Sequence, residues 1–150
     1  MKRIAILIFL VFVSASTYSC AQKMTQKEKF QSTYDTAKRL VLSKDYKFVG
    51  EVVYSNKNRE TLEPNTNFID IKQDNATVNL NKLRSKDNHK LKDTITDYKV
   101  DLDDEKQTIA ISFKINDNEF YIDVKPNGNA FLTLKNGLDY TSQVGKIVKE

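Results

Sequence analysis

Residues 66–80 read TNFIDIKQDNATVNL, and this stretch decides the fold. Two short runs of alternating apolar and polar residues, FIDI and ATVNL, flank the polar turn at residues 73–75, which is the pattern of a β-hairpin. We expect this hairpin to be structural scaffold that supplies five apolar side chains to the core: Phe68, Ile69, Ile71, Val78 and Leu80.

Similar alternation continues on both sides of the hairpin. Upstream, one face of residues 46–54 is expected to carry Gly50 with four apolar side chains: Tyr46, Phe48, Val52 and Tyr54. Downstream, polar turns such as Asn136-Gly137 separate further runs at residues 94–102, 109–115, 120–124, 130–134 and 138–144. The sequence therefore predicts a mainly β domain, an antiparallel meander of about eight strands. So many strands must curl into a barrel or split into a two-layer sandwich, because a long flat sheet leaves exposed edges.

Two polar stretches are expected to be loops. They are SNKNRETLEPN at residues 55–65 and KLRSKDNHKLK at residues 82–92, the second of which contains the single histidine, His89. Tyr121 and Phe131 fall on the face opposite to the core run of their strands. We favour packing of this pair beneath the helix over an exposed binding surface.

Residues 26–43 are expected to form one N-terminal amphipathic helix. Thr25 and Glu28 match a capping box, in which each side chain accepts a hydrogen bond from a free backbone N–H of the other. Downstream, apolar side chains recur at helical spacing in one stripe: Phe30, Tyr34, Ala37, Leu40 and Val41. The charge of the polar face is mixed, so we expect the stripe to cover a sheet face or one end of a barrel rather than a membrane surface.

The N-terminus has the organisation of an export signal. Lys2 and Arg3 precede ten apolar residues, too few to span a bilayer, and small or hydroxyl residues then lead to Cys20. We therefore expect residues 1–20 to be a signal peptide with a loose lipobox, TYSC, and residues 21–150 to be a single β-rich domain. In this interpretation the thiol of Cys20 carries the lipid that anchors the protein to the membrane.

Ordinary signal peptidase cleavage after Ala21 is the alternative, since Ser19-Cys20-Ala21 is also a small-x-small site. Residues 22–29 contain lysines rather than an acidic run. We favour the lipoprotein, exported to the periplasm or to the outer membrane with its domain facing the periplasm.

The composition argues against several functions. Without Lys2 and Arg3 the chain has 24 − 2 = 22 basic side chains against 20 acidic ones, scattered along the sequence, which disfavours nucleic-acid binding. One histidine and one cysteine do not make a catalytic pair or a usual zinc site, so we expect no cofactor, no catalytic set and no metal. The acidic run at residues 101–105 lacks the spacing of a calcium loop, and a hairpin turn explains it as well.

These features favour a non-enzymatic envelope protein, a lipid-anchored module that binds an unidentified envelope protein or small ligand through its sheet. Two alternatives stay open. One is a barrel that encloses a small apolar ligand. The other is a carboxylate-based enzyme acting on glycans, which needs two acids in one cleft, such as Asp123 with a neighbour on the adjoining strand.

Four segments show a family resemblance: AKRLVLSKDYKFVGEVVY at 37–54, NTNFIDIKQDNATVNL at 65–80, ITDYKV at 95–100 and LDYTSQVGKI at 138–147. The chain resembles, over about residues 30–147, the exported Bacteroidetes family called domain of unknown function 4251. The most specific matches are Asn67-Phe68, Tyr98, and Tyr140 with residues 145–147. Family members often carry a glycine-rich segment before Tyr98, where this chain has RSKDNHKLKDT. The resemblance implies export and a β-rich fold, and it adds no catalytic residue because the family has no assigned activity.

Overall fold

The computed structural model describes residues 24–55, 58–63, 66–80, 89–136 and 139–149. Within these ranges the helix α2, Gln26–Ser43, precedes ten strands: β1 Asp45–Ser55, β2 Asn58–Thr61, β3 Phe68–Lys72, β4 Asn75–Leu80, β5 His89–Thr94, β6 Thr96–Asp103, β7 Thr108–Ile115, β8 Asn118–Val124, β9 Asn129–Asn136 and β10 Asp139–Val148. The part of the chain described contains no helix long and apolar enough to span a membrane. The predictions for the signal peptide and for Cys20 lie outside the described residues.

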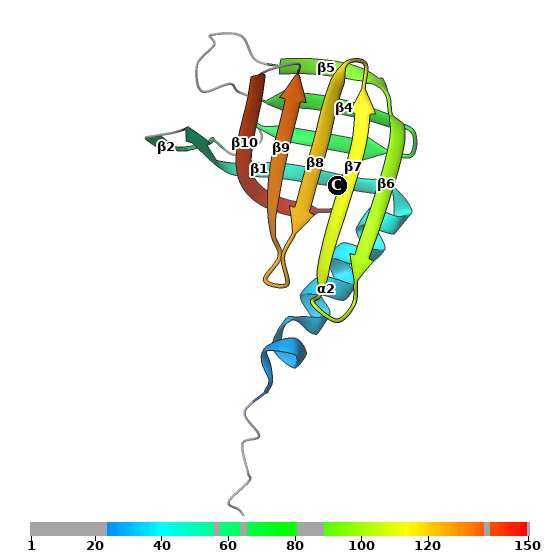
Figure 1. The fold of residues 1–150 in the computed structure, drawn as a ribbon, viewed down its shortest axis with the longest axis vertical. Coiled ribbons are helices and arrows are strands. Elements are labelled where there is room, and N and C mark those ends of the chain that lie inside the picture. Colours follow the sequence, from blue (N-terminus) through cyan, green and yellow to red (C-terminus); the bar gives the residue numbers. More distant parts are fainter. Residues whose placement is uncertain (1–23, 56–57, 64–65, 81–88, 137–138, 150) are drawn as a thin grey trace, which may run out of the picture.

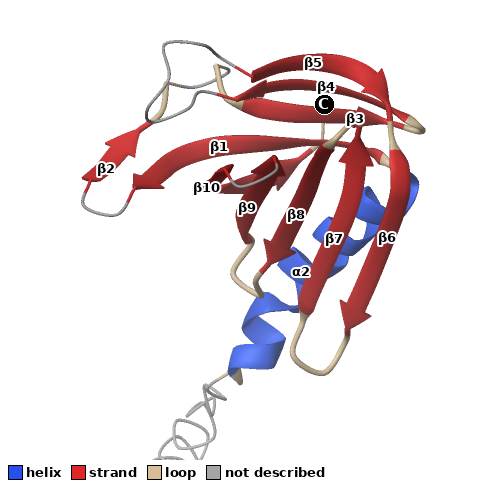
Figure 2. Cartoon of the chain, turned by 45° about the horizontal axis from the view of Figure 1, so that its top comes forward, coloured by secondary structure: helices blue, strands red, loops and turns tan. Residues whose placement is uncertain are grey.

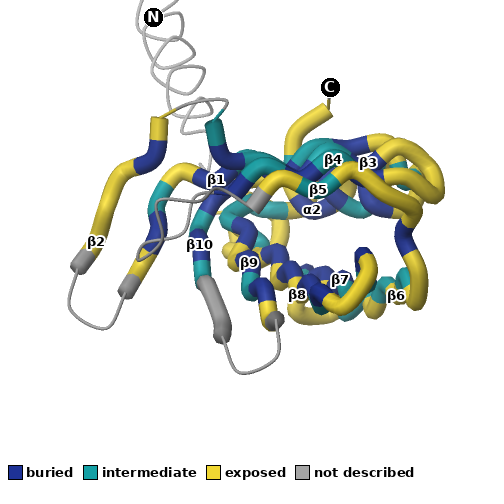
Figure 3. The backbone as a smooth tube through the Cα atoms, turned by 90° about the horizontal axis from the view of Figure 1, so that it is seen from above, coloured by how far each residue is buried: buried dark blue, intermediate teal, exposed yellow. Residues whose placement is uncertain are grey.

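The ten strands form one antiparallel sheet that curls back on itself. Its order is β5-β4-β3-β1-β10-β9-β8-β7-β6, with β2 beside the end of β1. In Figure 1 and Figure 2, β1, β3, β4 and β5 cross behind or above β6–β9 at a steep angle. Figure 3 shows these two groups as layers that face each other. The predicted mainly β meander is therefore confirmed, and it takes the form of a nearly closed, barrel-like sheet.

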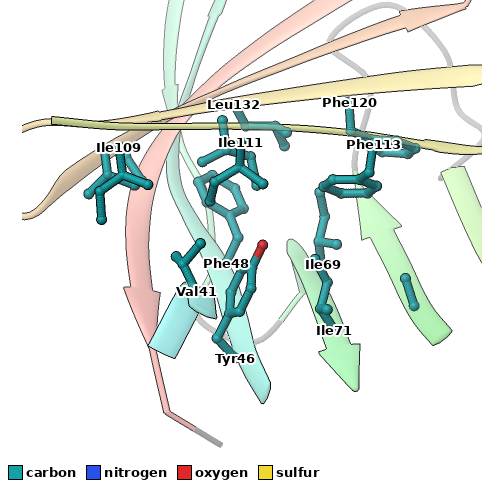
Figure 4. Packing of buried hydrophobic residues seen from close by; sticks show 14 of the residues in the cluster. Val41, Tyr46, Phe48, Ile69, Ile71, Ile109, Ile111, Phe113, Phe120 and Leu132 are labelled. Carbon is teal, nitrogen blue, oxygen red and sulfur yellow. The ribbon is translucent and has the colours of Figure 1, made fainter. Parts of the chain in front are cut away.

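The space between the layers is filled by apolar side chains from both. Tyr46, Phe48, Ile69 and Ile71 face the inward residues of β7–β9, all in one buried cluster (Figure 4). Within this cluster the ring of Phe113 stacks on that of Phe120 with 5.0 Å between centroids. Because the protein's own side chains occupy this space, the apolar-ligand barrel receives no support from the described residues.

The helix α2 completes the layer that faces β6–β9, as Figure 1 shows near the lower ends of β6 and β7. Its predicted bounds and capping box are confirmed, with the N–H of Glu28 donating to Thr25 Oγ1 at 3.2 Å. The buried part of its stripe is Tyr34, Ala37 and Val41. The β6–β7 turn holds the first turns of the helix, because the side-chain amide of buried Gln107 donates to the carbonyl oxygen of Lys27 at 3.0 Å.

A bulge in β1 corrects one of the predicted core faces. Gly50 pairs with Gly145, but the next pair is Val52 with Val144, so Glu51 is an extra residue. One extra residue reverses the alternation, since side chains on a strand point to opposite faces in turn. Val53 is therefore buried, whereas Val52 and Tyr54, predicted to share the core face with Tyr46, lie on the outside.

The two predicted loops each contain a strand, and this raises the count from about eight strands to ten. Asn58–Thr61 forms β2 and His89–Thr94 forms β5, both at edges of the sheet. Edge strands keep their backbone ladder while they carry charged rather than alternating apolar side chains, so the sequence pattern misses them. The opening hairpin is confirmed as β3 and β4, except that Phe68 points outward because Ile69 and Ile71 occupy the inner face.

Candidate functional site

The outward surface formed by β7–β10 and the end of β1 carries three exposed aromatic rings. Tyr54 is 48% exposed, Tyr121 44% and Phe131 38%. We call this surface the aromatic face and define it by nine residues: Val52, Tyr54, Ala110, Ser112, Tyr121, Phe131, Thr133, Ser142 and Val144.

Strand register makes the aromatic face continuous. One row across the sheet runs Ala110, Asp123, Phe131, Val144, Val52, and the next runs Ser112, Tyr121, Thr133, Ser142, Tyr54. Neighbouring strands lie about 4.8 Å apart, so Tyr121 and Tyr54, three strands apart, are separated by about 14 Å along the sheet. Small and hydroxyl side chains occupy the positions between them, which leaves the rings standing on an open surface.

The preferred interpretation of Tyr121 and Phe131 is corrected by this geometry. We expected α2 to cover them, but α2 lies on the inner side of the sheet, where Tyr34, Ala37 and Val41 join the core. The two rings are instead diagonal neighbours on β8 and β9, because Tyr121 pairs with Thr133 and Phe131 with Asp123. No described element covers them, so they form the exposed surface that was the second interpretation.

At one end of the aromatic face, ion pairs with lysines compensate the negative charge of Glu119. The hydroxyl of Tyr121 donates to Glu119 Oε2 at 3.0 Å, and this hydrogen bond raises the pKa of Tyr121 above its ordinary value. Lys114 Nζ lies 3.7 Å and Lys135 Nζ 4.0 Å from the same carboxylate. The phenol of Tyr121 is thus held neutral and in a fixed orientation.

The other end of the aromatic face is bordered by side chains of both positive and negative charge. The exposed carboxylates of Asp101 and Asp123 flank Ala110 and make no ion pair with the residues described. Lys99 pairs with Ser112 in the β6–β7 register, and Lys125 Nζ lies 5.9 Å from the centroid of the Phe131 ring. Asp123 stands between Ala110 and Phe131 in its row, so the face combines aromatic rings with hydroxyl groups and charges, as polar protein–protein interfaces do.

The carboxylate pair required by a glycan-acting enzyme is not formed around Asp123. Its neighbours on the adjoining strands are Ala110 and Phe131, and the nearest acid in the same row, Asp101, lies two strands away. Both acids stand on an open, exposed surface, whereas a glycan-acting enzyme needs them in a cleft that holds its substrate.

Two carboxylates of the acidic run at residues 101–105, those of Asp103 and Asp104, stabilise the fold. Asp103 Oδ1 accepts the backbone N–H groups of Glu105 and Lys106, as expected of a hairpin turn. Asp104 Oδ1 accepts hydrogen bonds from Lys38 Nζ and from the hydroxyl of Tyr34, both at 2.6 Å, which lower the pKa of the carboxyl. In the described ranges no three potential metal ligands come together. The side chain of His89 and all of Cys20 lie outside the described residues.

Comparison with known proteins agrees with this fold. The family model for a domain of unknown function, DUF4251, matches residues 28–142. The crystal structure of a DUF4251 family protein from Bacteroides eggerthii DSM 20697 is similar, with a TM-score of 0.63 and 19% sequence identity over 79% of this chain and 88% of that one. No curated protein matches the chain. The chain belongs to the DUF4251 family.

Proposed function

We propose that this protein is a non-enzymatic interaction module of the cell envelope and that it binds a partner protein through the aromatic face. The observation that carries the proposal is the set of three exposed rings, spaced across four adjacent strands and separated by hydroxyl side chains. Rigid aromatic anchors among serine and threonine residues are typical of protein-binding surfaces, because they give contact area at a low cost in conformational entropy.

The shape and charge of the face favour a protein over the other partners. The face is an open sheet surface, whereas a small ligand needs a concave site that buries most of its area. Its rim carries carboxylates as well as ammonium groups, which fits a partner with charges of both signs and disfavours an anionic lipid surface.

Site-specific photo-crosslinking in the native host tests this function. A benzophenone amino acid at Thr133, in the centre of the aromatic face, should give an adduct with one other protein, and the same group at Phe68, on the opposite layer, should not. An adduct of two copies of this chain would show that the aromatic face mediates self-association rather than binding to a different protein. An adduct whose added mass is removed by glycosidases would show that the partner is a glycan. Equal adducts from both positions, or none, would end the proposal.

The compartment is a second part of the proposal, supported by the N-terminal sequence. Ten apolar residues after Lys2-Arg3, followed by TYSC, suit export and lipidation of Cys20. Metabolic labelling with an alkyne fatty acid should mark the wild-type protein and not Cys20→Ala. Unlabelled wild-type protein that still leaves the cytoplasm would instead favour cleavage after Ala21.

A further inference from the structure

The end of the molecule at which α2 begins has a hollow with apolar residues in its lining. The first turns of α2, the β6–β7 turn at residues 104–107 and the β8–β9 turn at residues 125–128 lie together there (Figure 1). They line a hollow of about 390 Å³, in which Phe30 and Pro126 are apolar and half-buried. Phe30 belongs to the same stripe as buried Tyr34, so the stripe of α2 extends beyond the part that the sheet covers.

Charged side chains surround these apolar residues. Lys27, Lys106 and Lys125 line the hollow together with one described carboxylate, that of Glu105. Lys106 Nζ lies 2.9 Å from Asp103 Oδ2, so these two charges compensate each other. The ammonium groups of Lys27 and Lys125 make no ion pair with the residues that the structure describes.

Two residues at the start of α2 add to this end of the molecule. Met24 is 68% exposed, and Lys29 Nζ lies 5.5 Å from the centroid of the Phe30 ring. Glu28 is close by, but its carboxylate accepts the backbone N–H of Thr25 at 2.7 Å in the capping box. We define the end surface by six residues: Met24, Lys27, Lys29, Phe30, Lys125 and Pro126. It combines apolar side chains with three lysines, against the carboxylates of Glu28 and Glu105.

The end surface is next to the point at which the proposed lipid anchor joins the domain. Met24 follows Cys20 by only four residues. An extended chain spans about 3.5 Å per residue, so Met24 can lie no more than about 14 Å from Cys20. The eight residues of β7, by comparison, extend about 26 Å from this end of the molecule to the opposite one. A lipid on Cys20 would therefore hold the end surface, and not the opposite end, beside the headgroups.

We propose that the end surface docks on anionic phospholipid headgroups, an inference that rests on the proposed anchor at Cys20. Met24 and Phe30 place apolar side chains in the interfacial layer, while the lysines lay their methylene groups along it and direct their ammonium groups to phosphates. Docking fixes the orientation of a domain that a lipid chain alone would leave free to rotate. The strands of the aromatic face run away from this end, so the aromatic face stays open to a partner beside the membrane (Figure 1).

Photo-crosslinking in the native host tests this contact on the full chain. A benzophenone amino acid at Lys27 should capture phospholipid on irradiation, and intact mass spectrometry of the purified protein should show the added mass. The same group at Asp117 should capture none. Asp117 is the matched position, because it is exposed in the β7–β8 turn, at the other end of β7 from Lys106.

A pair of double variants separates docking from proximity through the tether. In the protein with the probe at Lys27, Lys29→Gln with Lys125→Gln should lower the phospholipid adduct by about fivefold or more, since each lysine near an anionic surface contributes about that factor. Lys90→Gln with Lys92→Gln removes the same charge from β5, at the opposite end of the molecule, and should leave the adduct unchanged. Equal yields from the two double variants would overturn the docking.

Fatty-acid labelling distinguishes failure of the docking from failure of the anchor. Labelled protein that gives no phospholipid adduct from Lys27, or gives as much from Asp117, would overturn the docking while the anchor stands. Unlabelled protein that still gives the Lys27 adduct would support the docking without the anchor, and unlabelled protein without that adduct would overturn both. A protein captured at Lys27 in place of phospholipid would assign this end to a protein partner and overturn the proposal.

Discussion

Gly145→Ala tests the bulge that gives β1 its two faces. A Cβ on Gly145 would collide with the carbonyl oxygen of Val49 and lie 3.0 Å from Gly50 Cα. Both are backbone atoms, so no side chain can rotate away, and β1 must separate from β10 at this point. Separation breaks about two ladder hydrogen bonds and loosens the packing of Val53 and Gln143, which are 1% exposed or less.

The expected loss in the free energy of unfolding is about 3 kcal/mol: about 1 kcal/mol for each hydrogen bond and about 1 kcal/mol for packing. Urea unfolding of the full chain, followed by circular dichroism, measures it. With a slope of about 2 kcal/mol per molar urea, the midpoint should fall by about 1.5 M.

Two controls separate this collision from the general effect of replacing a glycine or altering β10. Gly128→Ala, at a φ of 84° with its Cβ 3.0 Å from Thr33 Cγ2, should cost only about 1 kcal/mol. Ser142→Ala, on the outer surface of β10, should stay within about 0.5 kcal/mol of wild type. The reasoning is refuted if Gly145→Ala costs no more than Gly128→Ala.

Three further outcomes are expected. Tyr121→Thr with Phe131→Thr should abolish the adduct from Thr133, since burying the exposed 44% of Tyr121 alone is worth about 2 kcal/mol, or about thirtyfold in affinity. Because more than half of each ring is already covered by its neighbours in the fold, the free energy of unfolding should fall by about 2 kcal/mol while circular dichroism shows a folded variant. An undiminished adduct would contradict the aromatic face. Burial raises the pKa of Tyr46 well above its ordinary value, so wild type should lose stability as pH rises above about 10. Urea unfolding at pH 9 and at pH 11 should show a smaller loss of stability for Tyr46→Phe than for wild type, and equal losses would contradict this role of Tyr46. The hydrogen bond from Lys38 lowers the pKa of Asp104, so this contact stabilises the fold at neutral pH and ceases to do so as pH falls below the ordinary carboxyl range. In an acid titration, Asp104→Asn should therefore lack the loss of stability that wild type shows from this carboxylate.

The elements with a clean apolar pattern were predictable from the residues alone. The helix at residues 26–43 follows from its capping box and stripe, and the inward faces of β4 and β7 follow from period-two alternation, whereas Phe68 of β3 was wrongly assigned to the core. These patterns are local, because a half-buried strand or helix needs apolar residues at a fixed spacing whatever its partner is. Membership in the DUF4251 family was likewise readable in short segments, three of which lie within the residues 28–142 that the family model matches, while the fourth, 138–147, extends beyond them.

The candidate sites depended on contacts that no local pattern encodes. Val52 and Tyr54 reach the aromatic face only because Gly50 meets Gly145 across 95 residues of chain and β1 bulges there. Tyr121 and Phe131 have the same alternation whether a helix covers them or not, and the placement of α2 on the inner side decides that they are exposed. Asp70, Thr77 and Lys92 stand side by side because an edge strand without apolar alternation pairs with β4. The sequence by itself determined the helix and the alternation of most strands, because these patterns are local. The tertiary structure decided which face of β1 is buried and which of the remaining side chains share a surface, because both depend on how distant strands pair.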